Sequence, residues 1–204
     1  MTETIAMTSP TISARQAVTL ARSLLFVPGD RSDRFDKAAT SGADLVVCDL
    51  EDAVARASKD TAREAVAGWL GGGGGQAAVR VNAVGTPWHA ADCAALRGLS
   101  GLAAVMVPKA EDPDALVALS ASLGGDVPVI ALVETALGLH RAHDLAAATG
   151  VARLAFGAVD FALDAGTSQD DLALLYARSA LVVASRAAGV APPVDGVTLA
   201  LDDP

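Results

Sequence analysis

The chain has 204 residues, of which 52% are hydrophobic, and its formal net charge is −9 at pH 7. This length suits one domain with a large core, because a domain of this size buries about 70% of the surface that its unfolded chain exposes. The acidic balance excludes nucleic acid and anionic membranes from the expected partners, since both attract basic surfaces.

Residues 1–20 lack the basic start and apolar run of a signal peptide, and we expect a flexible tail there. No apolar run of about 18 residues is free of charge and glycine, so no membrane span is expected. Cys48 and Cys93 have apolar neighbours and no CxxC spacing, which indicates buried free thiols. We therefore expect a cytoplasmic protein whose residues 21–204 form one domain.

Seven short apolar runs alternate with amphipathic segments along the chain. The runs are apolar at both odd and even positions, which is typical of strands buried on both faces of a parallel sheet. They are residues 24–28, 45–48, 77–81, 103–108, 127–133, 152–157 and 197–201. The helical segments are residues 34–43, 58–70, 87–99, 113–123, 137–150 and 171–189. This order indicates an α/β fold with right-handed crossovers.

The number of strands leaves the architecture open. A (β/α)₈ barrel needs eight strands, so the pattern fits either an open doubly wound sheet or a barrel whose last strand lies outside this chain. The glycine run at residues 71–75 lacks the Lys-Ser/Thr ending of a phosphate-binding loop, and we interpret it as a flexible connection.

Polar residues follow almost every predicted strand, at the ends where parallel α/β folds place their ligand sites. A single strand must become polar where it meets solvent, but the repetition over seven strands favours a shared site. These residues are Asp30, Arg31, Asp49, Glu51, Asp52, Arg80, Asn82, Lys109, Glu134, Asp160, Asp202 and Asp203.

Two of these charges lie against apolar strands and need compensation. Arg80 is inside a strand, where a guanidinium must be paired or face a polar cavity. Glu134 ends the most hydrophobic run, where a carboxylate is costly unless a cation holds it ionised. One Mg²⁺ fits this need, because it prefers one or two carboxylates together with water and substrate oxygens. The acids predicted around it are Asp49, Glu51, Asp52, Glu134 and Asp160. Arg80 would then bind a substrate carboxylate in a bidentate manner.

The three histidines carry less information. His140 and His143 are three residues apart on a predicted helix without a third ligand, which indicates a solvated helix face. His89 follows a Pro-Trp turn, where capping or packing is expected. No GxSxG elbow, GxGxxG fingerprint or Cys-His arrangement is present.

The motifs RSLLFVPGDRSDRFDKAATSGADLVVCDLEDAV, KDTAR, VRVN, VPKAE, LVETALG and FGAVDFALDAG occur in this order. In this the chain resembles the citrate lyase beta-subunit family of the HpcH/HpaI aldolase superfamily. The resemblance implies a (β/α)₈ barrel that forms a trimer or hexamer. It also implies a Mg²⁺-dependent carbon–carbon lyase acting on acyl-CoA thioesters such as citryl-, malyl- or citramalyl-CoA.

The resemblance also assigns roles to individual residues. It makes Glu134 and Asp160 the direct Mg²⁺ ligands and Arg80 the residue that grips the oxo acid, and all three catalytic. Asp49, Glu51 and Asp52 would hold water molecules around the metal. Phe26, Arg31 and Lys37, together with Arg80 and Glu134, would contact the substrate or its CoA part.

The chain departs from the family pattern at two places. Val159 stands where relatives carry an acid before Asp160, and the chain ends before the eighth strand and the C-terminal extension of relatives. We therefore expect a C-terminally incomplete barrel, with the source of its eighth strand and of any further catalytic acid left open.

Four other functions compete with the lyase. The same metal site would serve a thioester hydrolase or an aldolase of free hydroxy acids, and an incomplete barrel would suit a non-catalytic subunit. A phosphoacceptor receiver domain also combines clustered acids with a lysine. Its acids follow the first strand and its lysine the last, whereas here they follow the second and fourth predicted strands.

Overall fold

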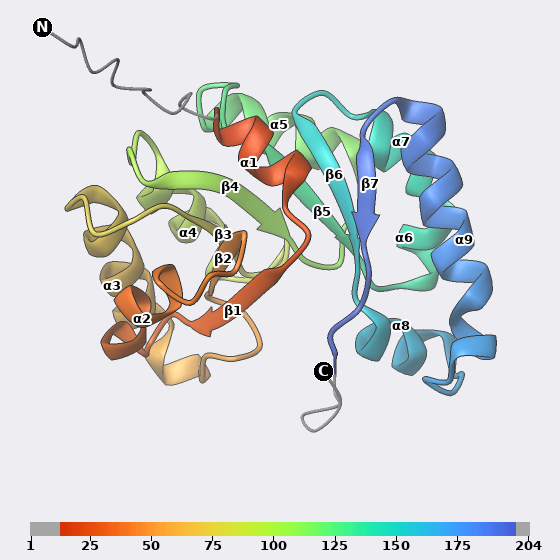
Figure 1. Cartoon of the computed structure of the whole chain (residues 1–204), viewed down its shortest axis with the longest axis horizontal. Coiled ribbons are helices and arrows are strands. Elements are labelled where there is room, and N and C mark those ends of the chain that lie inside the picture. Colours follow the sequence, from red (N-terminus) through yellow and green to blue (C-terminus); the bar gives the residue numbers. More distant parts are fainter. Residues whose placement is uncertain (1–12, 199–204) are drawn as a thin grey trace, which may run out of the picture.

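The centre of the molecule is a curled sheet of parallel strands, seen in a computed structural model that describes residues 13–198 (Figure 1). The strands lie in chain order from β1 to β7, and each pairs in parallel with the next. They are β1 (Leu24–Pro28), β2 (Leu45–Asp49), β3 (Ala77–Arg80), β4 (Leu102–Val107), β5 (Val129–Val133), β6 (Val151–Phe156) and β7 (Ala191–Val194). The sequential order excludes a receiver domain, whose doubly wound order is 2-1-3-4-5.

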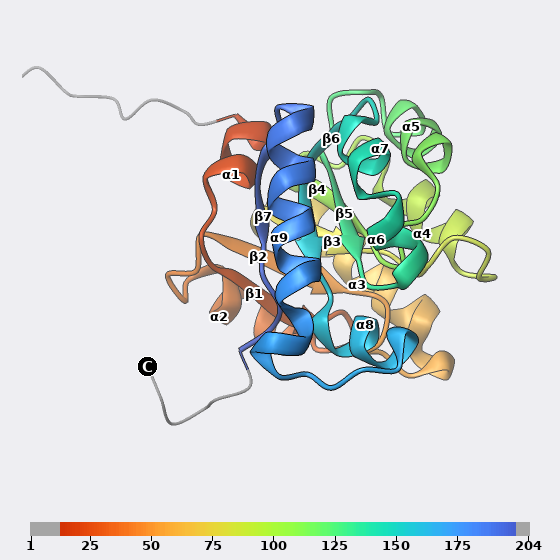
Figure 2. The ribbon, with the colours of Figure 1, turned by 90° about the vertical axis from the view of Figure 1, so that its right-hand side faces the viewer.

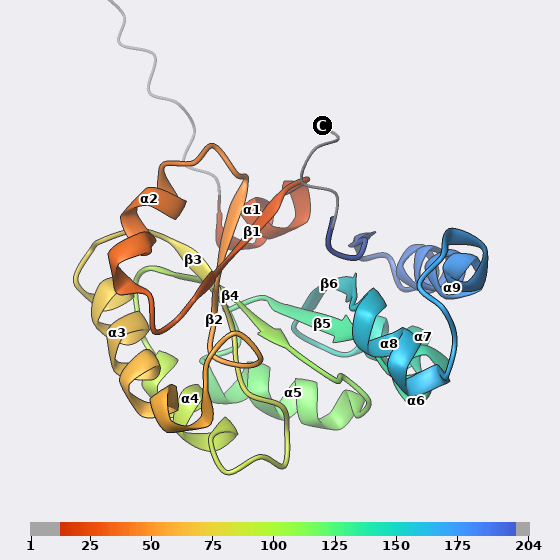
Figure 3. The ribbon, with the colours of Figure 1, turned by 90° about the horizontal axis from the view of Figure 1, so that it is seen from below.

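Helices cover the outside of the curl, and Figure 3 shows them around an open barrel seen along its strands. They are α2 (Phe35–Ala39), α3 (Lys59–Gly71), α4 (His89–Leu96), α5 (Pro113–Ser122), α6 (Ala136–His140), α7 (Ala142–Ala147), α8 (Ala158–Ala165) and α9 (Asp171–Ala188), with 3₁₀ turns at Ser32–Arg34 and Arg56–Ser58. The predicted α/β barrel class is confirmed, as an open barrel with seven strands within residues 13–198. None of the described helices has the length and apolar character needed to cross a membrane.

Alternation along each strand divides the core into two layers. In β2, Val46 and Cys48 belong to the layer under the helices, whereas Leu45 and Val47 belong to the cluster inside the barrel. Both layers are apolar, which explains why the strands are hydrophobic at odd and even positions. Cys48 and Cys93 are both buried and free, as predicted.

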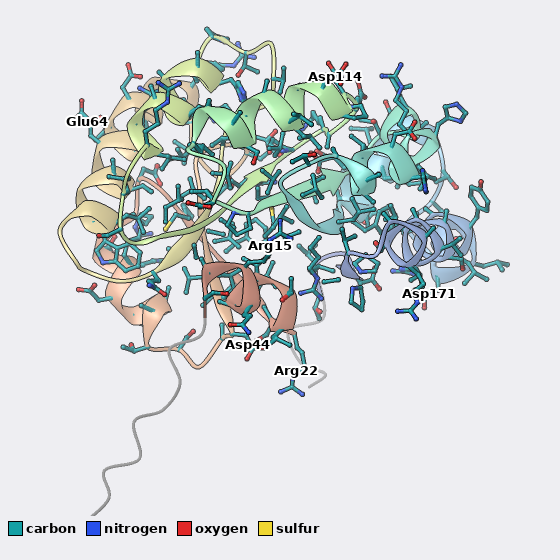
Figure 4. All side chains as sticks on the ribbon, turned by 90° about the horizontal axis from the view of Figure 1, so that it is seen from above. Arg15, Arg22, Asp44, Glu64, Asp114 and Asp171 are labelled. Atoms are coloured by element: carbon teal, nitrogen blue, oxygen red, sulfur yellow. The ribbon has the colours of Figure 1, made fainter. Side chains whose placement is uncertain are left out.

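The N-terminal segment contains a helix that we did not expect. Residues 14–20 form α1 (Ala14–Leu20), which starts at a capping box between Ser13 and Gln16. Val18 is 1% exposed and packs into the inner cluster, so α1 closes the N-terminal opening of the barrel (Figures 1 and 4). The prediction of a flexible tail was therefore wrong for residues 14–20, and residues 1–12 lie outside the described part.

Asp44 fastens the connection between α1 and β1 to the start of β2. Its Oδ2 accepts the backbone N–H groups of Arg22, at 2.8 Å, and Ser23, at 3.0 Å, and Asp44 lies beside Arg22 in Figure 4. The chain that leads into the barrel is thus held at the end opposite the carboxyl ends of the strands.

The last predicted strand is placed differently. β7 is Ala191–Val194, whereas residues 197–198 are outside any strand and residues 199–201 lie outside the described part, so the prediction of a strand from residue 197 was wrong. We did not predict β7 because it contains Pro192 and Pro193, and proline lacks the N–H that a residue of a central strand donates. β7 is an edge strand among the described residues and pairs with β6 alone, beside α9 (Figure 2).

Gly71 ends α3, and residues 72–75 of the glycine run connect α3 to β3, as predicted. These residues lack side chains for a steric reason, because the Trp69 ring packs over them. A Cβ atom on Gly74 or Gly75 would lie 2.4 or 2.6 Å from the Trp69 ring.

Arg153 links α1 to β7 at the closed end of the barrel. Its Nη1 donates to the carbonyl oxygens of Val18 and Ala21, and its Nε donates to that of Pro192. Replacing Arg153 by Met removes the donor from the buried carbonyls of Val18 and Ala21, and we expect the free energy of unfolding to fall by about 2–4 kcal/mol. Urea denaturation of parent and variant tests this, and equal midpoints would contradict it.

Candidate active site

A cavity of about 370 Å³ opens at the carboxyl end of the barrel. Alternation along the strands positions its polar side chains, because Asp49 continues the inward series of Leu45 and Val47 in β2. Arg80 likewise continues the inward series of Ala78 in β3, and Glu134 continues that of Ile130 and Leu132 in β5. Asp160 comes from the first turn of α8, which directly follows β6. The lining includes Phe26, Asp49, Asp52, Arg80, Glu134, Gly157, Asp160 and Val194.

Arg80 is held by a fork-to-fork ion pair with Asp49. Its Nε lies 2.8 Å from Oδ1 and its Nη2 lies 2.6 Å from Oδ2 of that buried carboxylate. Asp49 also accepts the backbone N–H groups of Glu51 and Ala53, at 2.9 and 3.0 Å. Both oxygens of Asp49 are therefore engaged within the protein, and the bidentate face of Arg80 that we had expected to hold a substrate is engaged by Asp49.

The third guanidinium nitrogen of Arg80 points to the other acids of the β2 turn. Nη1 lies 3.2 Å from Glu51 Oε2 and 3.9 Å from Asp52 Oδ2, and the guanidinium lies 5.3 Å from the centroid of the Phe26 ring. Burial lowers the pKa of Arg80, but Asp49, Glu51 and Asp52 more than offset it and the pKa is raised. Arg80 is therefore a fixed positive charge, and Nη1 is its one terminal nitrogen that is not hydrogen-bonded to Asp49.

Glu134 is 3% exposed and lies in a space shaped to receive its carboxylate. Its Oε1 accepts the backbone N–H of Lys109 at 2.9 Å. A Cβ atom on Gly157 would lie 2.4 Å from its Oε2, so only glycine leaves room for this carboxylate. Burial raises the pKa of Glu134 to about 7, although Lys109 opposes the shift. Such a carboxylate gains strongly from a cation.

Lys109 brings the remaining acids together at one point. Its Nζ lies 3.0 Å from Glu51 Oε1, 3.2 Å from Asp160 Oδ2 and 3.6 Å from Glu134 Oε1. The sequence placed Lys109 at the end of the fourth strand, but we gave it no role in the site. Its position after a strand was the one indication in the sequence that it belongs to the site. Its three contacts could be identified only from the folded structure.

The donors present fit a hard divalent cation. Glu134 and Asp160 offer carboxylate oxygens within 3.6 Å of a single atom, Lys109 Nζ, so both can reach one ion. Within residues 13–198 no group of three or more His, Cys, Asp or Glu side chains forms a metal cage. Two carboxylates with room for water and substrate suit Mg²⁺, which seldom occupies a cage made of protein alone.

Lys59 is a further residue of the site that the sequence did not reveal. It is 6% exposed, and its Nζ donates to the carbonyl oxygens of Leu50 and Glu51, both at 2.7 Å. Burial lowers the pKa of Lys59. Lys59 therefore fixes the turn that carries the acids after β2. It is the first residue of α3, and nothing in the sequence around it indicated this role.

The histidines lie outside this cavity. His89 Nδ1 is 2.7 Å from the carbonyl oxygen of Asn82, and its Nε2 is 3.6 Å from Cys93 Sγ, in agreement with the expected packing role. His140 and His143 are exposed, as predicted.

Two predicted residues lie in a neighbouring groove. Arg31 and Lys37 line a depression of about 770 Å³ beside β1 and α2, together with Arg34, which we had not singled out. Arg31 is paired with Asp33 at 2.8 Å. Phe26 lines both this groove and the main cavity, so the two are adjacent.

The raised pKa of Glu134 predicts a pH-dependent stability. Its ordinary value is 4.5 and its folded value about 7, so between these pH values the folded protein holds a proton that the unfolded chain has lost. The free energy of unfolding therefore falls as pH rises through this window, by up to about 3 kcal/mol. Denaturation of parent and Glu134→Gln from pH 4.5 to 8 without metal tests this. The variant should lack that part of the decrease, and parallel curves would contradict the assignment.

Residues 22–204 match the family HpcH/HpaI aldolase/citrate lyase. The chain belongs to this family. A citrate lyase subunit beta-like protein of Deinococcus radiodurans is 35% identical, over 91% of this chain and 68% of its own length. A (3S)-malyl-CoA thioesterase of Cereibacter sphaeroides is 36% identical, over 89% of this chain and 65% of its own length.

A solved structure of a family member shares the fold. It is the protein CitE from Mycobacterium tuberculosis in complex with magnesium, acetoacetate and coenzyme A. It is 37% identical, with a TM-score of 0.75 over 90% of this chain and 68% of that chain. The resemblance inferred from the motifs is confirmed, and the chain spans about two thirds of the length of these relatives.

Proposed function

We propose that this chain carries the metal site of a Mg²⁺-dependent carbon–carbon lyase that cleaves, or forms, a 3-hydroxyacyl-CoA such as citryl-, malyl- or citramalyl-CoA. The observation that carries the proposal is the convergence of Glu134 and Asp160 beside Arg80 in one cavity. The magnesium and coenzyme A in the structure of the related CitE protein support it.

Glu134 and Asp160 would hold Mg²⁺, which when bound supplies Lewis acidity that lowers the pKa of a substrate hydroxyl. Loss of the hydroxyl proton turns the carbon that bears the hydroxyl into a carbonyl and breaks the bond from that carbon to the carbon next to the thioester. The bonding electrons move into the thioester as an enolate, which takes up a proton and leaves as acyl-CoA. The other product is an oxo acid such as pyruvate, glyoxylate or oxaloacetate.

Arg80 is placed to hold the oxo-acid end during this cleavage. Asp49 fixes its Nε and Nη2, so Nη1 is the nitrogen available for a substrate carboxylate. A guanidinium positioned before the reaction loses little entropy on binding, and its charge holds the carboxylate that the substrate and the oxo acid share. Glu51 and Asp52 would contact metal-bound water from the edge of the site.

The groove beside β1 suits the phosphate-bearing part of coenzyme A. Arg31, Arg34 and Lys37 give it three cationic side chains, which bind phosphate oxygens well. Phe26 lies between the groove and the cavity, where the thioester arm would pass.

A thioester hydrolase is the second candidate, because a relative of similar identity is a (3S)-malyl-CoA thioesterase. An aldolase of free hydroxy acids would use the same metal site. A non-catalytic subunit is the remaining alternative, since β1 and β7 are unpaired with each other within the described residues.

The test is to incubate the protein and Mg²⁺ with malyl-, citramalyl- and citryl-CoA and with the matching free acids. A lyase releases an oxo acid and acyl-CoA without free thiol, whereas a thioesterase releases free thiol and a hydroxy acid. Oxo acid from a thioester alone supports the proposal. Thiol release, cleavage of free acids only, or no turnover would each favour one of the alternatives.

Self-association as a trimer or hexamer and a cytoplasmic location are also proposals that follow from family resemblance. Light scattering coupled to size-exclusion chromatography tests the first, and a monomer at all concentrations would contradict it.

A further inference from the structure

Lys109 has the most unusual setting in the site. Within residues 13–198 it is the single non-glycine residue with a positive φ, 48°. This conformation is costly for a side chain with a Cβ atom, and such strain persists where surrounding contacts impose it. The backbone N–H of Lys109 is bound by Glu134 Oε1 at 2.9 Å. The carboxylate that would hold a metal therefore also fixes the backbone of Lys109.

The side chain of Lys109 returns to the same carboxylate. Its Nζ is 3.6 Å from Glu134 Oε1 and 3.2 Å from Asp160 Oδ2, and Glu51 Oε1 completes the set at 3.0 Å. An ion bound by Glu134 and Asp160 would sit about 2.1 Å from an oxygen of each. It would share the space of the ammonium group, and the two positive charges would repel at that distance.

We propose that Lys109 is a built-in counterion that occupies the divalent cation position between Glu134 and Asp160 and is displaced when the cation binds. The inference rests on the metal site proposed above and adds the residue with which the metal competes. While it is in place, Lys109 compensates the repulsion among three acids and keeps two of them directed at one point.

The geometry allows this displacement. Lys109 is 41% exposed, so its four-carbon side chain has a route to solvent without any backbone movement. Arg80 has no such route, because Asp49 fixes two of its nitrogens and it is only 13% exposed. Of the two cations at the acids, Lys109 is the one that can leave.

Calorimetric titration of Mg²⁺ into the parent chain, Lys109→Met, Lys109→Arg and Arg22→Met tests the competition. Removing the positive charge that competes for the cation position should lower the Kd for Mg²⁺ at least about tenfold in Lys109→Met. Lys109→Arg keeps the charge and should not bind more tightly. Arg22→Met loses the same charge at the opposite end of the barrel and should change Kd by less than about twofold. The Mg²⁺-induced rise in Tm should be larger in Lys109→Met than in the parent.

The parent chain offers a second readout that needs no variant. The sequence contains three lysines, so amine acylation followed by mass spectrometry reports on each. Mg²⁺ should increase acylation of Lys109 and leave exposed Lys37 and buried Lys59 unchanged. Parent binding without tighter binding by Lys109→Met, or unchanged acylation of Lys109 at saturating Mg²⁺, would overturn this inference while the metal site stands. Absence of Mg²⁺ binding in every chain would overturn both.

Discussion

Replacing Glu134 by Gln or Asp160 by Asn should weaken Mg²⁺ binding, measured calorimetrically in the presence of pyruvate, by more than about 100-fold. Residues that only support a metal ligand typically cost about 10- to 100-fold, so a larger loss identifies direct ligands. Both substitutions keep the shape of the side chain and remove its charge. Turnover of the thioester substrate should fall with metal affinity, because the hydroxyl would no longer be acidified.

Loss of folding cannot account for this result at Glu134. The buried carboxylate has a pKa raised to about 7, so the amide should stabilise the metal-free chain above that pH. Glu64→Gln and Asp114→Asn provide matched controls, since both acids are exposed and outside the cavity (Figure 4). They should bind Mg²⁺ like the parent. Wild-type affinity in either site variant would remove that residue from the ligand set.

The strand pattern predicted much of this site because alternation determines which side chains point inward. Asp49 and Arg80 each extend an inward series by one position at the carboxyl end of a strand, and Glu134 continues the series after β5. Their convergence followed from the parallel order of the strands. Six of the seven strands also lie where their apolar runs indicated, since each is long enough and free of proline in its interior.

Other features depend on contacts that no local pattern encodes. Helix α1 buries one side chain, Val18, so the sequence shows no repeated apolar spacing there. β7 contains two prolines, and proline in a sheet is confined to edge strands, strand starts and bulges, so the sequence pattern did not indicate a strand there. Lys59 and Lys109 act on groups up to 58 residues away in the chain, and a lone lysine gives no sign of such partners. The pairing of Arg80 with Asp49 likewise required the distances between strands.

Substitution of Gly157 by Ala should disrupt the metal site without changing any charge. The new Cβ would lie 2.4 Å from Glu134 Oε2 and 2.5 Å from Glu134 Cβ, distances that real Cβ atoms do not show. Backbone strain is not the cause, since the φ of Gly157 is −92°, which alanine adopts freely. The carboxylate must therefore move, and we expect Mg²⁺ affinity to fall by at least about tenfold, because metal ligands tolerate little displacement.

Gly68→Ala is the matched control for this prediction. Gly68 is inside helix α3 with nothing within 4 Å of an added Cβ, so alanine should raise the free energy of unfolding by about 0.5–1 kcal/mol and leave Mg²⁺ binding unchanged. If Gly157→Ala also binds Mg²⁺ like the parent, Glu134 does not need the space that glycine leaves, and its place in the metal site would be wrong. If Mg²⁺ affinity falls in Gly157→Ala and not in Gly68→Ala, metal affinity depends on the position of the Glu134 carboxylate. That position is possible because residue 157 has no Cβ atom.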